Sequence, residues 1–167
     1  EMSKAGVSID RIAYILDEKE EDDRPGVTKP AINKDIVFDK VNFKYEEGAA
    51  VLKDVSFTVP AGKTFAILGN TGSGKSTLVH LLNRLYDLPD GCGKITIGGV
   101  DIRDIDRQYL RSQIGMVLQE PFLYSGSIKE NVGITRESSA FDDIREACEI
   151  ACVDSAIDSF TDGYETI

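Results

Sequence analysis

The feature that most constrains this chain is an eight-residue run that matches the pattern G-x-x-x-x-G-K-[ST] in full, Gly69-Asn70-Thr71-Gly72-Ser73-Gly74-Lys75-Ser76. Residues with little or no side chain let backbone N–H groups turn inward around a phosphate. A helix that begins near Gly74 adds free N–H groups and the positive end of its dipole. Lys75 can then reach the β- and γ-phosphates, the Ser76 hydroxyl can ligate Mg²⁺, and Thr77 is a further candidate donor. The run therefore predicts a phosphate-binding loop.

The segments on either side of the loop support the same prediction. Residues 63–68 form a short run typical of a buried parallel strand, apolar on both faces. After the loop, apolar residues recur at helical spacing until the turn residues 89–91 end the helix. These apolar residues are Leu78, Val79, Leu81, Leu82 and Leu85. A strand, a glycine loop and a helix in this order favour a phosphate loop over an ordinary glycine-rich turn.

The composition excludes some classes of partner. The chain has 167 residues, enough for one domain with a hydrophobic core. No apolar run approaches the roughly 20 residues that a membrane-spanning helix needs. The formal net charge of −10 argues against a nucleic-acid-binding face, which needs clustered Lys and Arg. We therefore expect no nucleic-acid partner.

Three parts are predicted along the chain. Residues 1–33 join the domain to something upstream, because an amphipathic helical pattern in residues 1–20 is followed by a charged stretch that contains prolines. Residues 34–122 form the predicted core. Residues 123–167 lack clear strand signals and are predicted to be the start of a helical region.

The predicted core contains strands of two kinds. Polar and apolar residues alternate in 40–45 and again in 51–59, which predicts an antiparallel pair with one solvated face. The pattern of residues 94–97 predicts another short strand, and that of residues 114–118 predicts a second buried strand. Gln119 follows directly. It would thus lie at the carboxyl end of that strand, where open α/β sheets bind ligands.

Weaker patterns predict the remaining helices and one further strand. Residues 104–112 are mostly polar and favour a short surface helix, while 131–134 give a weak strand signal. Residues 139–142 resemble a capping box. A helical stripe follows this box, and a further short helix is predicted over 155–160. The stripe consists of Phe141, Ile144, Cys148 and Ala151.

Several short stretches share their order and spacing with one known family. They are residues 41–45, 51–57, 69–76, 93–102, 114–124 and 127–131. Together they resemble the nucleotide-binding domain of ABC transporters of the exporter type, over nearly all of residues 36–167. The resemblance implies an α/β fold, a P-loop NTPase core with an N-terminal antiparallel β-subdomain and the start of a helical subdomain, truncated at Ile167. It also implies that residues 1–33 follow a membrane domain.

The resemblance further implies roles for single residues. Tyr45 matches the aromatic residue that stacks on adenine, and Gln119 matches the flexible glutamine that approaches Mg²⁺ and the attacking water. Lys75 and Gln119 are thus the implied catalytic residues, Ser76 and Gln119 the metal ligands, and ATP and Mg²⁺ the cofactors. From the residues alone, Tyr45 also fits a core residue at a strand end, and Gln119 a surface amide. The implied nucleotide-binding residues are Tyr45, Gly69, Asn70, Thr71, Gly72, Ser73, Gly74, Lys75, Ser76 and Thr77.

The implied partners are the exporter's transmembrane domain and a second nucleotide-binding domain, joined head to tail at the cytoplasmic face of a membrane. Residues 122–127 match the surface that touches the membrane domain, although they fit a core corner nearly as well. An L-S-G-G-Q loop, an apolar strand ending in Asp-Glu and a switch histidine are all missing through Ile167. We therefore expect this chain to bind nucleotide without appreciable hydrolysis. Two alternatives stay open: a degenerate regulatory module of a heterodimeric exporter, and a soluble ABC-type ATPase.

Overall fold

The computed structural model describes residues 9, 11–17, 28–46, 48–120, 122–136 and 139–167. The chain divides into two units, Glu1–Gly115 and Met116–Ile167, and each has its own cluster of buried side chains. Residues 11–16 are helical, within the predicted N-terminal helix. Most of the predicted linker, residues 18–27, lies outside the described residues. The helices in the described part of the chain are all too short or too polar to cross a bilayer.

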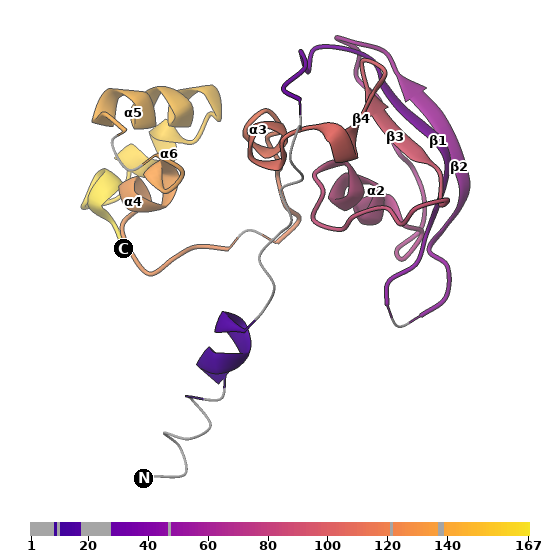
Figure 1. Ribbon diagram of the computed structural model, residues 1–167. Coiled ribbons are helices and arrows are strands. Elements are labelled where there is room, and N and C mark those ends of the chain that lie inside the picture. Colours follow the sequence, from indigo (N-terminus) through magenta and orange to yellow (C-terminus); the bar gives the residue numbers. More distant parts are fainter. Residues whose placement is uncertain (1–8, 10, 18–27, 47, 121, 137–138) are drawn as a thin grey trace. The chain divides into compact units, whose positions relative to one another are not determined.

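The first unit is built on an antiparallel sheet (Figure 1). Its strands are β1 (Ile36–Phe43), β2 (Leu52–Val59), β3 (Lys94–Ile97) and β4 (Val100–Asp101), in the order β2-β1-β3-β4. In the β1–β2 pair, Ile36 lies opposite Val59 and Phe38 opposite Phe57. The predicted antiparallel pair and the predicted strand 94–97 are therefore confirmed.

The β1–β2 ladder is interrupted shortly before Tyr45. Its register shifts between Phe38 and Val41, where Lys40 has a φ of 50°. It shifts again between Val41 and Phe43, where Asp54 on the other strand has a φ of 49°. Side chains take up backbone donors there. The Lys40 N–H donates to Ser56 Oγ at 2.8 Å, and the Asp54 N–H donates to Asn42 Oδ1 at 2.9 Å. Such irregularities bend a strand and redirect the residues that follow.

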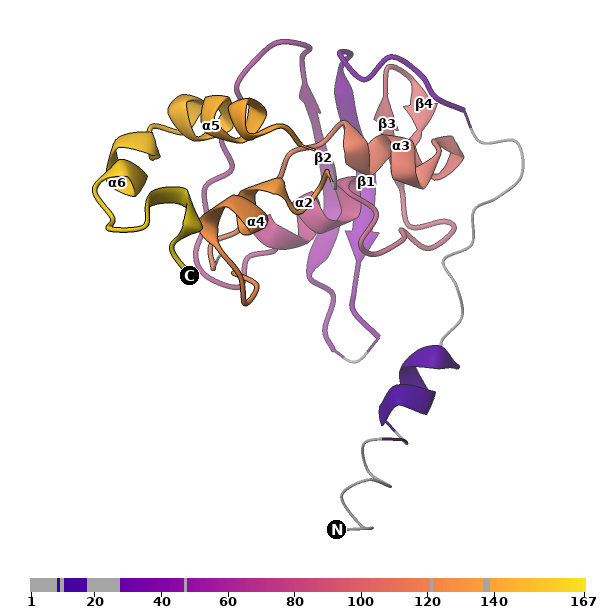
Figure 2. The same cartoon turned by 90° about the vertical axis from the view of Figure 1, so that its left-hand side faces the viewer.

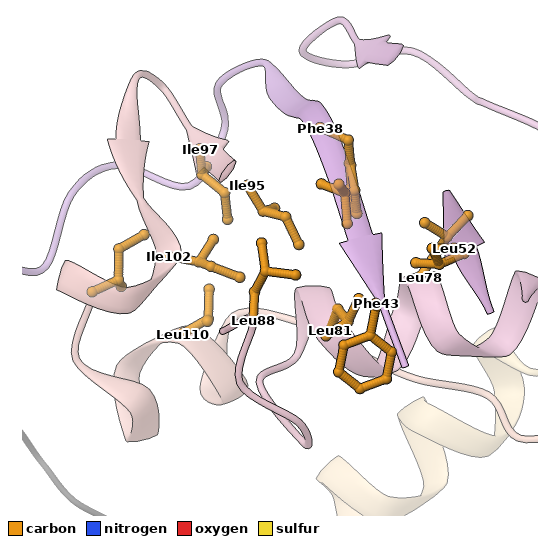
Figure 3. Packing of buried hydrophobic residues seen from close by; sticks show 12 residues of the cluster. Phe38, Phe43, Leu52, Leu78, Leu81, Leu88, Ile95, Ile97, Ile102 and Leu110 are labelled. Carbon is orange, nitrogen blue, oxygen red and sulfur yellow. The ribbon is translucent and has the colours of Figure 1, made fainter. Parts of the chain in front are cut away.

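Helix α2 (Lys75–Leu82) lies on one face of the sheet (Figures 1 and 2). Its apolar stripe is confirmed for Leu78 and Leu81, which are buried, whereas Val79 is 39% exposed. Leu85, 48% exposed, lies beyond the end of the helix. The 3₁₀ turn η1 (Ile102–Asp104) and helix α3 (Arg107–Ser112) close the same core. Because Leu110 is fully buried there, the expected surface helix is partly a core element. Figure 3 shows the resulting cluster of Phe38, Phe43, Leu52, Leu78, Leu81, Leu88, Ile95, Ile97, Ile102 and Leu110.

Arginine side chains fix the turn that follows α2. The buried Arg84 and the buried Arg107 each form an ion pair with Asp87, at 2.9 Å in both cases. Arg111 donates to the carbonyl oxygens of Asn83 at 3.2 Å and of Arg84 at 2.7 Å, which satisfies acceptors at the carboxyl end of α2. These contacts tie residues 83–87 to α3, so the turn is held from several directions.

The two predicted parallel strands are not strands in this structure. Residues 63–68 and 114–118 have no regular secondary structure, and Leu68 and Val117 are 92% and 100% exposed. An apolar run becomes a parallel strand only when neighbouring strands pair with it and helices cover it. Among the described residues neither segment pairs with a strand, which is why the predictions were wrong.

The second unit is helical. It comprises α4 (Ile128–Gly133), α5 (Phe141–Ile150), α6 (Asp154–Asp158) and the 3₁₀ turn η2 (Gly163–Glu165). These elements pack around the buried side chains of Ile144, Cys148, Ile157 and Tyr164. The helices predicted from 141 and over 155–160 are thus confirmed in type, and the sheet and helices together give the predicted α/β class.

Two local predictions in this unit were wrong. The weak strand signal over 131–134 falls mainly within helix α4. The capping box lies at the start of α4, where Ser127 and Glu130 bond each other's backbone N–H groups, and not at 139–142. Helix α5 instead begins after Ala140 without a side-chain cap, because the alanine side chain has no oxygen to accept a hydrogen bond from the N–H groups of the first turn.

Candidate functional site

The glycine-rich loop meets α2 at Gly74, a position that only glycine fits. Gly74 has a φ of 90°, in the left-handed region, and precedes the first helical residue, Lys75. A Cβ atom on Gly74 would lie 2.7 Å from Leu52 Cδ2 and 3.2 Å from Val51 Cγ1. The loop therefore packs tightly against the beginning of β2, which fixes where the first turn of α2 starts.

Lys75 folds back over the loop. Its ammonium group donates to the carbonyl oxygens of Gly69 at 2.8 Å and Asn70 at 2.7 Å. The Ser73 N–H also donates to the Asn70 carbonyl, at 3.2 Å. Residues 69–75 thus form a closed turn with one cation bound at its backbone.

The start of α2 offers hydrogen-bond donors to an anion. No side chain caps Gly74, and no acidic residue stands in the first turn. The first N–H groups of a helix have no acceptor within the helix, and the dipole makes this end positive. Ser76, in the same turn, is exposed. An uncapped, acid-free helix start with an adjacent lysine is a favourable environment for phosphate.

A pocket of about 230 Å³ joins this helix start to Tyr45. Its lining residues are Tyr45, Val51, Gly72, Gly74, Lys75, Ser76 and Thr77. The Tyr45 hydroxyl lies 3.0 Å from the hydroxyl of Thr77, a buried side chain. The structure therefore brings the predicted aromatic residue next to predicted loop residues that are about thirty positions away in sequence.

Two aromatic rings meet the Tyr45 ring. The Phe43 ring lies 5.1 Å from it at 84°, and the Tyr86 ring 4.9 Å from it at 82°. Both arrangements are edge-to-face, the geometry that aromatic pairs prefer. The sequence did not identify Tyr86 or Val51 as site residues, and no spacing pattern links either of them to the loop.

Other predicted site residues lie outside this pocket. Asn70 and Thr71 are exposed on the loop and do not line it. Gln119 belongs to the second unit, where it is exposed, so its approach to a metal ion stays a prediction. Among the described residues, no group of three or more His, Cys, Asp or Glu side chains could hold a metal ion.

The second unit has an apolar hollow of its own, with a volume of about 600 Å³. Leu123 and Tyr124 line it together with Ile128 and Val132 of α4. The Asn131 side chain orders the loop before α4: it accepts from the Tyr124 N–H at 2.7 Å and donates to the Tyr124 and Ser127 carbonyls, each at 3.0 Å. Phe122 and Leu123, about three-quarters exposed, stand on the preceding segment.

Comparison with known proteins places these features in a family. A family model described as ABC transporter matches residues 52–164. A fatty acid ABC transporter ATP-binding/permease protein of Mycobacterium bovis is 44% identical over 159 residues, covering 95% of this chain and 25% of the relative. The human ATP-binding cassette sub-family B member 6 is 40% identical over 153 residues, covering 91% of this chain and 18% of the relative. The chain thus spans a quarter or less of the length of these two relatives.

A solved structure is also similar to this chain. It is a bacterial Atm1-family ABC exporter with ATP bound. It matches with a TM-score of 0.82 and 30% sequence identity, and the match covers 98% of this chain and 29% of the exporter chain.

Proposed function

Because this chain belongs to the ABC transporter family, we propose that it is the ATP-binding part of an exporter and that Tyr45 and residues 69–77 bind the nucleotide. The observation that supports this site best is the pocket shared by Tyr45 and the first turn of α2. An aromatic ring and a set of phosphate-binding groups in one pocket match the two ends of a nucleoside triphosphate.

The phosphates would be bound by backbone and ammonium groups. The N–H groups of the loop and of the first turn of α2 point their partial positive charge at the anion. Lys75 exchanges the Gly69 and Asn70 carbonyls for phosphate oxygens, since its ammonium group binds a negatively charged oxygen more strongly than a neutral carbonyl. The loop carbonyls hold the lysine near this position before the nucleotide arrives.

Mg²⁺ would neutralise part of the charge on the phosphates. Magnesium is commonly bound by one or two protein oxygens together with substrate phosphates and waters. The exposed Ser76 hydroxyl in the first turn of α2 fits one such ligand. We propose Gln119 as a second ligand, through its amide oxygen. In the intact protein, Gln119 would also orient the water that attacks the terminal phosphate.

The similarity to exporters supports proposals for two further surfaces. We propose that Phe122–Ser127 contact cytoplasmic helices of a transmembrane domain, since exposed aromatic and aliphatic side chains there border an apolar hollow. A second nucleotide-binding domain would pair head to tail with this one, at the cytoplasmic face of the membrane. ATP binding would then favour the closed pair, and hydrolysis in the intact protein would reopen it.

Replacing Tyr45 by alanine tests the site. We expect Tyr45→Ala to weaken ATP binding about tenfold, because stacking on a base contributes about 1–3 kcal/mol. Binding of magnesium tripolyphosphate, which has no base, should stay the same. Isothermal titration calorimetry of the 167-residue chain with both ligands measures the two affinities. An unchanged ATP affinity would remove Tyr45 from the site, and an equal loss for both ligands would point to damage in the loop.

We also propose that the 167-residue chain does not turn over ATP appreciably. Phosphoryl transfer to water needs a positioned nucleophile as well as a stabilised terminal phosphate. The family's signature loop and general base have no counterpart among residues 1–167. We expect phosphate release with Mg²⁺ and ATP to equal that of the Lys75→Ala variant. Steady-state release that disappears in Lys75→Ala would contradict this proposal.

A further inference from the structure

We propose that Tyr86 is a positioning residue, which orients the Tyr45 ring so that it can stack on the base of the bound nucleotide. This inference rests on the proposed function, because it assumes that Tyr45 contacts the base. Tyr86 lies on the turn after α2 and does not line the pocket of the phosphate loop. We therefore assign it an effect that is exerted through Tyr45.

Tyr45 is restrained at three places. Its hydroxyl lies 3.0 Å from Thr77 Oγ1, and its ring meets Phe43 and Tyr86 edge to face. Phe43 is part of β1 and buried in the core, so it cannot move independently of the sheet. Tyr86 is the one restraint of these three that comes from neither the sheet nor α2 itself.

Two ion pairs and a side-chain hydrogen bond to the backbone hold the turn that bears Tyr86. Tyr86 stands between Arg84 and Asp87, which are joined by an ion pair at 2.9 Å. Arg107 holds Asp87 from α3, and Arg111 holds the Arg84 carbonyl. The Tyr86 side chain itself is 46% exposed. A rigid backbone under a half-exposed ring is suited to fixing the orientation of a neighbouring ring, as the support of a binding site requires.

Tyr45 also separates two hollows. The pocket of the phosphate loop lies against it, and a larger open hollow of about 700 Å³ is lined by Tyr45, Tyr86 and Phe43 with Lys44, Glu46, Asp87 and Pro89. Of the two aromatic rings that meet Tyr45, only Phe43 would remain without Tyr86. The ring would then sample more orientations, and stacking would cost more conformational entropy.

The test is calorimetry of the 167-residue chain with MgATP and with magnesium tripolyphosphate. We expect Tyr86→Ala to weaken ATP binding about three- to tenfold, the effect of losing one aromatic pair, and to leave tripolyphosphate binding unchanged. Tyr86→Phe should retain wild-type affinity because it keeps the ring. Leu85→Ala is the matched control, since Leu85 is 48% exposed on the same turn, and it should change neither affinity.

A double variant separates positioning from direct contact with the nucleotide. In a Tyr45→Ala background, Tyr86→Ala should cause no further loss of ATP affinity. A full additional loss there, an equal loss for both ligands, or wild-type ATP affinity in Tyr86→Ala would each overturn the inference. Failure of the proposed function looks different: the wild-type chain would then bind neither ligand, or Lys75→Ala would bind both as well as the wild type does.

Discussion

Replacing Lys75 by alanine is expected to weaken binding of MgATP about 10- to 150-fold. The lysine supplies the one side-chain cation of the loop run, and hydrogen bonds to charged groups contribute about 1.5–3 kcal/mol. The loss should be nearly the same for tripolyphosphate, because Lys75 acts on the phosphates and not on the base. Calorimetry with both ligands measures the effect.

The fold should survive this substitution. The Lys75 ammonium binds loop carbonyls of the exposed loop, so its removal leaves no buried group without a partner. Lys63→Ala is the matched control: it removes the same charge from an exposed position of the same unit, outside the loop. Equal affinities of Lys75→Ala and Lys63→Ala for ATP would contradict the proposed role of Lys75.

Replacing Gly74 by alanine is expected to damage both stability and nucleotide binding. A φ of 90° strains any residue with a Cβ atom, at a cost of about 1–3 kcal/mol. The new Cβ atom would also approach Leu52 Cδ2 to 2.7 Å, and Leu52 is a buried core side chain. Overpacking of this kind costs about 1–3 kcal/mol more. The shift should move the start of α2 and misplace its N–H groups.

Gly91→Ala separates the effect of backbone strain from the effect of the close contact with Leu52. Gly91 has a φ of 78°, but a Cβ atom there would meet no atom within 4 Å. We expect Gly91→Ala to lower the melting temperature modestly and to bind ATP normally. Gly74→Ala should lower the melting temperature more and should also weaken ATP binding. Circular dichroism on heating and calorimetry provide the measurements. Normal ATP affinity in Gly74→Ala would show that the close fit to Leu52 does not matter for the site.

Local patterns predicted elements that have one buried face in the first unit, including β3, whose partner β1 is distant in sequence. The alternation in 51–59 corresponds to a half-buried face of β2, and the stripe through Leu78 and Leu81 to a buried face of α2. The sequence predicts the loop run residue by residue, because a tight backbone turn restricts the side chains, and the phosphate-binding role of these residues stays a prediction. Gly74 illustrates this restriction with its left-handed φ and its contact with β2.

The two buried strands predicted from apolar composition alone were wrong. The runs 63–68 and 114–118 have the composition of buried strands, but composition does not show whether a neighbouring strand pairs with them. The contact of Tyr86 with Tyr45 joins residues about forty positions apart and leaves no periodic signal. By contrast, the capping box at Ser127 and Glu130 follows the S-x-x-E pattern and was available in the sequence.

Backbone N–H groups around residues 70–76, together with Lys75, are proposed to bind the phosphates of a nucleotide. Two-dimensional ¹H–¹⁵N NMR of the labelled 167-residue chain, titrated with MgATP, observes these groups directly. We expect saturable shifts of the amide signals of Gly72, Ser73, Gly74 and Lys75, with smaller shifts at Tyr45, and in Lys75→Ala the loop shifts should need about 10- to 150-fold more MgATP. Loop amide signals that stay in place while ATP is added to saturating concentration would contradict the claim.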